Sequence, residues 1–262
     1  MKSIVTIAYL AALSLGTAQS GFALARTPPT LSVPRTPTTP KLDADPADPA
    51  WKDAAAIPAL GLCLGDQQKD LHPLATQVKL LWSEDALYVR FLCDDDQQYI
   101  PNHGHDSPIW KGDAVEVFLD VKGDARQWIE LEVSPSNDTF DQLATLTAEP
   151  RSDADGLLES EVSQRDWWTD LSWDLDGWRT AARIDAHGGW IVDMAIPASA
   201  LRRLGRNKYA PLTMRANFIR YKYLPAPAGE ARRLLAMDWA PVVYGCPHLS
   251  PQAMGYLQLQ TK

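Results

Sequence analysis

Short stretches in which apolar and polar residues alternate dominate the hydrophobic pattern of the chain. A strand presents every second residue to the same side, so a period of two predicts strands with one buried face. The clearest stretch is 114–119, where Val115, Val117 and Leu119 would point one way and Glu116 and Phe118 the other. Further strands are predicted at 77–82, 86–93, 126–135, 139–144, 178–184, 189–197, 212–221, 231–239 and 253–260.

The turns between these stretches contain Pro, Gly and Asp, and no strong amphipathic helix interrupts them. Many short strands separated by such turns are typical of an all-β protein built as a sandwich. Only 197–204 predicts a short helix, because Ala198, Leu201 and Leu204 have a suitable spacing. We therefore expect a β-sandwich of the jelly-roll or immunoglobulin-like kind with one short helix.

The first 40 residues have a different character. A basic start precedes an apolar run at 4–15, which has the length of a signal-peptide core and is too short to span a bilayer as a helix. With a small-x-small site at 23–25, this predicts a signal peptide over 1–25 and a secreted or periplasmic protein with no stable membrane association after cleavage. An uncleaved membrane tether is the alternative. Residues 26–40, rich in Pro and Thr, predict an extended linker, which leaves one folded domain over 41–262.

Charge and cysteine content narrow the possible partners. The chain has 25 Lys and Arg against 33 Asp and Glu, a formal charge of −8, which argues against nucleic acid but not against neutral sugars. The cysteines are Cys63, Cys93 and Cys246, without the C-x-x-C spacing of a zinc ribbon. In an exported protein a Cys63–Cys93 disulfide is favoured, because the two lie one hairpin length apart. The alternative is that Cys93 is a buried apolar residue.

A candidate sugar site combines Trp110, on a loop between Pro108 and Gly112, with Glu116 six residues later. The C–H face of a sugar ring stacks on an aromatic plate, and its hydroxyls need polar partners once water is displaced. The alternative is that Trp110 packs in the core and Glu116 lies on a solvated strand face. Three tryptophans at 167, 168 and 173 would either line a sugar groove or pack a long loop.

The segment 106–120, D-S-P-I-W-K-G-D-A-V-E-V-F-L-D, resembles the signature of carbohydrate-binding module family 9. Further motifs follow in the expected order: T-Q-V-K-L-L-W-S-E-D-A-L-Y-V-R-F (76–91), I-E-L-E-V-S-P-S-N-D-T-F-D (129–141), G-W-I-V-D-M-A-I-P (189–197), R-A-N-F-I-R-Y (215–221) and M-G-Y-L-Q-L (254–259). Together they extend over most of 41–262, so the resemblance is fairly specific. It implies a sandwich fold and non-catalytic binding of plant-type polysaccharides or oligosaccharide ends, in a domain attached to xylanases or secreted alone.

In this family two aromatic plates sandwich a terminal sugar. The resemblance places the first plate at Trp110 and a ligand-binding carboxylate at Glu116. The second plate, a Trp in relatives, falls on His248, with Tyr244 as an alternative. The residues expected to contact carbohydrate are thus Trp110, Glu116, Arg126, Asn217, Tyr244 and His248. For Arg126 and Asn217, the alternative is that each pairs at a strand edge with one of the excess carboxylates.

Metal ligands have weaker support. Residues 94–96 are three consecutive aspartates at a strand end, which suits calcium, an ion that some members of the family bind. A solvated loop is the alternative. His103 and His105 form an H-x-H pair, but neighbouring Pro and Gly residues break strand geometry, so we expect two solvated histidines rather than a transition-metal site.

Two other classes of function remain open. Glu116, Glu130 and Glu132 would share one sheet face, and two carboxylates across a cleft are the arrangement of a glycoside hydrolase. Against it, these residues alternate with ordinary core positions and no second cleft-forming domain follows. Related sandwich domains bind haem for electron transfer, and the available ligands are Met194, Met214, Met237 and His248.

Overall fold

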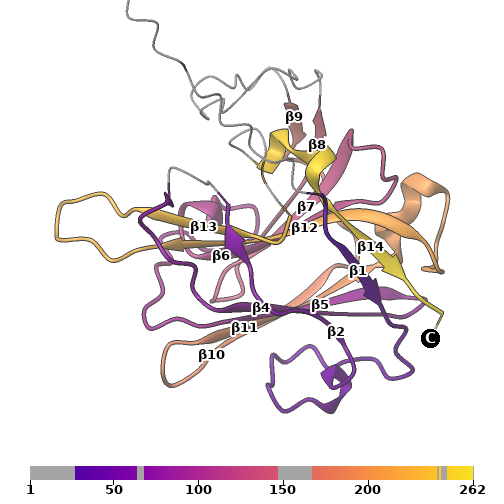
Figure 1. Ribbon diagram of the computed structural model, residues 1–262, viewed down its shortest axis with the longest axis horizontal. Helices are drawn as coiled ribbons and strands as arrows, with labels where there is room; N and C mark the ends of the chain where they lie inside the picture. Colours follow the sequence, from indigo (N-terminus) through magenta and orange to yellow (C-terminus); the bar gives the residue numbers. More distant parts are fainter. Residues whose placement is uncertain (1–26, 64–67, 147–166, 241, 243–246, 262) are drawn as a thin grey trace, which may run out of the picture.

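The computed structural model describes residues 27–63, 68–146, 167–240, 242 and 247–261. Within these residues the strands form two sheets packed face to face (Figure 1). One sheet has nine strands in the order β1-β14-β12-β6-β7-β8-β9, with β13 pairing with β12 and β3. The other has five, in the order β10-β11-β5-β4-β2. The predicted all-β sandwich is confirmed.

Between the strands of the described residues, every pair is antiparallel except β1–β14, which is parallel. The nine-stranded sheet contains β1 (Thr30–Val33), β3 (Gly61–Leu62), β6 (Ala114–Asp120), β7 (Gln127–Val133), β8 (Thr139–Leu146), β9 (Trp167–Asp170), β12 (Thr213–Tyr223), β13 (Leu234–Asp238) and β14 (Gly255–Leu259). The five-stranded sheet contains β2 (Ala55–Ile57), β4 (Thr76–Trp82), β5 (Ala86–Cys93), β10 (Arg179–Ile184) and β11 (Trp190–Pro197). Short 3-10 helices connect them: η1 (Pro49–Trp51), η3 (Ile109–Lys111), η4 (Ala198–Leu204), η5 (Pro247–Leu249) and η6 (Pro251–Ala253).

The main hydrophobic core lies between the two sheets. Val115, Val117 and Leu119 of β6 enter it and are fully buried, as their alternation predicts. Phe118 belongs instead to a second apolar cluster on the other side of the nine-stranded sheet. The helix expected at 197–204 is η4, a 3-10 helix that ends at Gly205 in the left-handed conformation, with φ of 67°.

The proline-rich linker was predicted over 26–40, but part of it belongs to the sandwich. Thr30–Val33 forms β1, which pairs with β14 at the edge of the nine-stranded sheet, and Val33 is fully buried in the main core. Thr36 donates its backbone N–H to the carbonyl of Trp82. The prediction failed because it rested on composition, whereas β1 itself contains no proline and the prolines at 29 and 34 only flank it.

The aspartate run at 94–96 does not present three free carboxylates for calcium. Asp94 and Asp96 are exposed, whereas the Asp95 side chain is fully buried. It pairs with Arg220 at 3.1 Å and with Lys222 at 2.8 Å. Two cations already neutralise the buried Asp95, so its carboxylate is not free to serve as a ligand of the calcium ion that was considered for this run.

The disulfide expected between Cys63 and Cys93 is also absent, because Cys93 is a buried free thiol in β5. Burial raises the pKa of its thiol to about 12, so Cys93 behaves as the small apolar residue that was the alternative. Among the described residues, no helix has both the length and the apolar character needed to cross a membrane.

Candidate functional site

The face of the nine-stranded sheet that is turned away from the core combines carboxyl groups with aromatic rings. We call it the outer face. Its central positions are Glu116, Phe118, Trp128, Glu130, Glu132, Phe140 and Gln142. The strand register places Glu132 opposite Glu116 on β6 and opposite Phe140 on β8. The prediction that the three glutamates share one sheet face is therefore confirmed.

Trp110 lies at the border of the outer face, in η3. Its side chain is half-buried, and its ring meets the Phe140 ring edge to face, with centroids 4.8 Å apart. Its backbone carbonyl accepts a hydrogen bond from the Tyr223 hydroxyl at 3.0 Å. The turn requires glycine at position 112, because a Cβ atom there would approach the Pro101 ring to 2.5 Å. Trp110 is thus held in place through its backbone and its ring contact, while the residue as a whole stays half-buried.

The carboxyl groups of the outer face are buried against one another. Glu130 accepts hydrogen bonds from Gln142 and from His248, each at 2.8 Å. Burial opposes its ionisation, but the charge and hydrogen bond of His248 outweigh that effect and lower the pKa of Glu130. Glu132 is affected in the opposite direction, because burial and the negative charges of Glu116 and Glu130 raise its pKa well above the ordinary value.

His248, the expected second plate, packs onto the outer face from η5. Its ring lies 5.0 Å from the Phe118 ring and 6.3 Å from the Trp128 ring, measured between centroids. With Nε2 directed at Glu130, the imidazole covers that carboxylate. His248 therefore occupies space above the sheet that a sugar ring bound over Phe118 and Glu130 would need.

The remaining expected contacts are less well placed. Asn217 is buried, and its amide is used internally, since it accepts from Ala240 N at 2.8 Å and donates to Ala240 O at 3.2 Å. Arg126 is exposed just before β7, at the end of that strand far from Glu132. Tyr244 lies outside the described residues.

The tryptophans near 170 lie in different surroundings. Trp168 is 55% exposed and Trp173 is partly buried against the main core. The side chain of Trp167 lies outside the described part of the chain.

The ligands considered for haem do not converge. Met194, Met214 and Met237 are fully buried in the main core, whereas His248 lies on the opposite side of the nine-stranded sheet. His248 and one of these methionines therefore cannot be the two axial ligands of one haem, and the methionines themselves are fully buried in the packed core.

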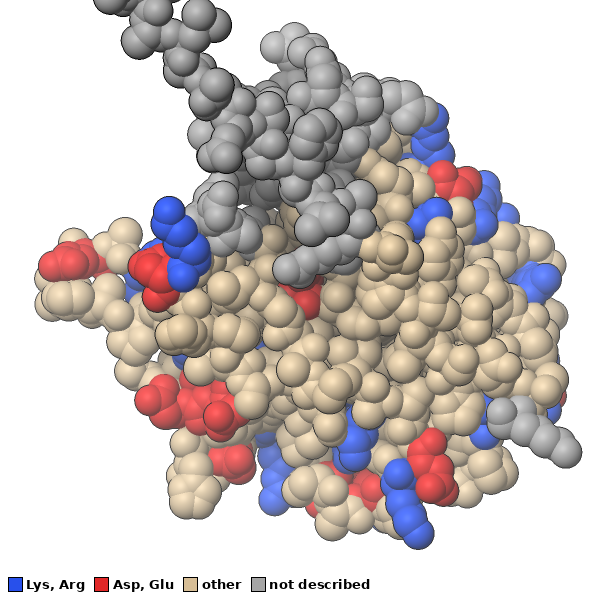
Figure 2. Space-filling model, viewed as in Figure 1, with Lys and Arg blue, Asp and Glu red and all other residues tan. Residues whose placement is uncertain are grey.

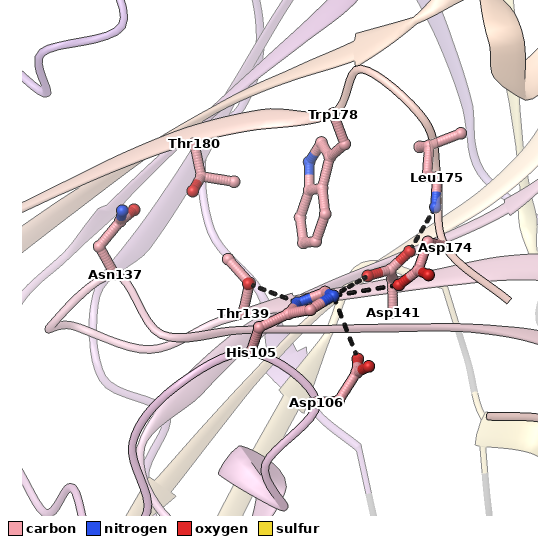
Figure 3. A pocket seen from close by; sticks show the side chains of 9 residues that line it. All are labelled: His105, Asp106, Asn137, Thr139, Asp141, Asp174, Leu175, Trp178 and Thr180. Atoms are coloured by element: carbon pink, nitrogen blue, oxygen red, sulfur yellow. Dashed lines mark hydrogen bonds and ion pairs between the residues drawn. The ribbon is translucent and has the colours of Figure 1, made fainter. Parts of the chain in front are cut away.

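A separate polar cavity of about 570 Å³ opens at the inner side of β8 (Figure 3). His105, Asp106, Asp141 and Asp174 meet in its wall. Sequence reasoning missed this cluster, because its members come from three distant segments and His105 was interpreted as a solvated loop residue.

Comparison with known proteins connects this fold to carbohydrate binding. The family described as carbohydrate family 9 binding domain-like matches residues 42–218. No curated protein matches the chain.

Solved structures with the same fold have low sequence identity. A putative carbohydrate-binding protein from Bacteroides uniformis is 15% identical, with a TM-score of 0.65 over 89% of this chain and 100% of its own. A family 9 carbohydrate-binding module from Caldicellulosiruptor kristjanssonii in complex with cellotriose is 17% identical, with a TM-score of 0.60 over 89% and 94%. The same organism's module in complex with glucose is 16% identical, with a TM-score of 0.57 over 88% and 96%.

Proposed function

Because the chain belongs to the carbohydrate family 9 binding domain-like family, we propose that it binds carbohydrate at the outer face, beside Trp110. The family is one of non-catalytic binding modules, and the protein accordingly acts by binding rather than by hydrolysis. The observation that supports this location is the position of Trp110, a half-buried ring at the border of a surface that gathers Glu116, Glu130, Glu132 and Gln142.

The proposed contacts follow from the chemistry of a sugar ring. The half-buried Trp110 would stack on the C–H face of the sugar. The carboxylate of Glu116 would accept hydrogen bonds from the sugar hydroxyls, which requires that it first become accessible, since Glu116 is 1% exposed. His248 covers Glu130, so a ring that reaches further along the outer face must displace the imidazole. The chain would then bind a terminal sugar at Trp110 more readily than it would enclose one between two plates.

The ligands named for the two Caldicellulosiruptor modules, cellotriose and glucose, are the probes we choose for this chain. The charge of this protein suits a neutral ligand, since the chain carries a formal charge of −8. Figure 2 shows acidic and basic side chains interspersed on the visible face, with no continuous basic surface for a polyanion.

The test is a paired measurement on the Trp110→Ala variant, in which cellotriose titration and thermal melting are compared with those of the unchanged chain. We expect an affinity loss of about tenfold or more, equivalent to about 1.4 kcal/mol, with a small change in melting temperature. Trp168→Ala is the matched control, because Trp168 is an exposed tryptophan on β9. A large drop in melting temperature for Trp110→Ala, with unchanged affinity per folded molecule, would make Trp110 a packing residue.

We also propose that the protein is exported and takes part in polysaccharide breakdown outside the cytoplasm, as a scavenging, sensing or substrate-targeting component. The support is the apolar run at 4–15, the small-residue site at 23–25 and the family, whose domains are typically extracellular. Mass spectrometry of the secreted or periplasmic protein should show a mature start near Gly21 or Arg26. A mature chain that still carries Lys2 would contradict cleavage.

A further inference from the structure

We propose that His105, Asp106, Asp141 and Asp174 form a binding site for a divalent first-row transition-metal ion such as Zn²⁺. One ligand atom from each of the four residues lies within 4.8 Å of all the others. Figure 3 shows their side chains turned toward one another in the wall of the cavity.

The distances within the cluster suit a small ion. Nε2 of His105 lies 3.0 Å from Asp174 Oδ1, 3.6 Å from Asp106 Oδ1 and 4.0 Å from Asp141 Oδ1. Ligands bound at about 2.0–2.1 Å in tetrahedral geometry are about 3.3–3.4 Å apart. Small movements of the exposed His105, Asp106 and Asp174 would therefore complete the shell around the buried Asp141.

The burial of Asp141 distinguishes this cluster from an ordinary group of acidic residues on a surface. The residue is 1% exposed, and its Oδ2 accepts the backbone N–H of Leu175 at 2.6 Å. Its Oδ1 is directed into the cluster, and among the described residues it receives no hydrogen bond. The carboxylate of a residue this buried is poorly hydrated, so a cation beside its cavity-facing oxygen would stabilise its charge.

The lining of the cavity does not supply that cation. Apart from the cluster itself, the described residues in the wall are Asn137, Thr139, Leu175, Trp178 and Thr180, with no Lys or Arg among them. Three carboxylates therefore face a single imidazole, a balance that favours a bound dication.

The contact behind the imidazole of His105 is the one found in metal sites that contain histidine. His105 Nδ1 lies 3.1 Å from Thr139 Oγ1, a contact that can hold the proton on Nδ1 and leave the Nε2 lone pair for a metal. An imidazole nitrogen also decides the class of ion, because calcium and magnesium take oxygen ligands while zinc and its neighbours accept both nitrogen and oxygen.

The site is independent of the proposed sugar site. Thr139 and Asp141 lie on the inner side of β8, whereas Phe140 and Gln142 of the same strand lie on the outer face. A bound ion would tie the loop that carries His105 and Asp106 to β8 and to the segment after β9. We therefore expect metal binding to raise the melting temperature without any sugar present.

The test is calorimetric titration of the chelator-treated full chain with Zn²⁺ and, separately, with Ca²⁺. We expect one Zn²⁺ per chain and a rise in melting temperature that a chelator reverses. His105→Ala should weaken Zn²⁺ binding at least about tenfold, and Thr139→Val by about tenfold, through the orientation of the imidazole. His103→Ala is the matched control, because His103 is an exposed histidine on the same loop that pairs with Asp138 instead.

Titration with Co²⁺ provides a spectroscopic check, since its visible absorption depends on the ligand set. Asp141→Asn and His105→Ala should each alter or abolish that spectrum, while circular dichroism shows that the variants remain folded. The proposal is overturned if the unchanged chain binds no Zn²⁺, if His103→Ala and His105→Ala weaken binding equally, or if Ca²⁺ binds more tightly than Zn²⁺ and His105→Ala does not affect it.

Discussion

At the scale of single residues, the outer face accepts an energetic cost that an ordinary sheet surface avoids. Glu116 and Glu132 are 1% exposed and Glu130 is 2% exposed, so three carboxyl groups are kept away from water within one small area. Removing a carboxylate from water is unfavourable unless charges or hydrogen bonds compensate it. Glu130 has such compensation in His248 and Gln142, whereas Oε2 of Glu132 accepts no hydrogen bond from the described residues.

The raised pKa of Glu132 makes a prediction about stability and pH. When the pH exceeds the ordinary pKa of a glutamate, the unfolded chain loses the Glu132 proton. The folded chain retains that proton until the pH reaches the raised pKa of Glu132. The free energy of unfolding should therefore fall as pH rises through this window, by at most about 1.4 kcal/mol per pH unit for this group. Glu132→Gln should remove that fall and stabilise the protein at neutral pH, as measured by urea denaturation at several pH values.

Glu130→Gln is the control with the opposite sign. The pKa of Glu130 is lowered, so its contribution to stability is present above the ordinary pKa and lost as pH falls through the lowered value. The variant should therefore be less stable than the unchanged chain at neutral pH. Equal effects of the two substitutions would contradict the assignment of the raised pKa to Glu132 and the lowered pKa to Glu130.

The residues of the two sites differ in how far the sequence could predict them. Period-two alternation was enough to place Glu116, Glu130 and Glu132 on one face, because strand geometry fixes which side chains share a side. It could not place His248 over Glu130, since that contact depends on how η5 returns to the sheet. The cluster at His105 forms only when the loop with His105 and Asp106, strand β8 with Asp141, and the segment with Asp174 come together in the fold. The spacing of these residues along the chain therefore does not predict it.

At the scale of elements, β1 shows how a local interpretation can miss a strand. The strand is four residues long and lies near Pro29 and Pro34, so composition predicts a linker. Alternation is present nevertheless, because Val33 is buried in the core and Leu31 packs partly against it. The prolines contribute through their carbonyls, since Pro29 accepts from Tyr256 N and Pro34 from Trp82 N.

A chain that begins at Lys41, the domain boundary that the sequence suggests, should consequently be less stable than one that begins at Arg26. It loses the parallel pairing of β1 with β14 and the burial of Val33, which alone is worth about 1.5–3 kcal/mol. Differential scanning fluorimetry of the two chains measures the effect. Identical melting temperatures would show that β1 contributes nothing to the sandwich.

At the scale of the whole molecule, a buried network of charges joins the two sheets. Arg220 and Lys222 extend from β12 of the nine-stranded sheet toward Asp95, which directly follows the β5 region of the five-stranded sheet. Arg220 also donates to Thr76 Oγ1 on β4 at 2.9 Å, and the Lys222 ammonium pairs with Asp113 at 2.9 Å. The network stabilises the edge of the sandwich from which the loop leading to Trp110 extends, so it helps to hold the proposed site in place.

Asp95→Asn should therefore destabilise the whole fold. Removing one partner of a buried ion pair leaves uncompensated charge behind, at a cost of about 3–5 kcal/mol. Asp94→Asn and Asp96→Asn are matched controls from the same aspartate run, and because both residues are exposed they should change the free energy of unfolding by about 0.5 kcal/mol or less. Urea denaturation of the three variants, with and without Ca²⁺, tests this directly. If the run bound calcium instead, all three substitutions would reduce a calcium-dependent stabilisation, and the special role assigned to Asp95 would be wrong.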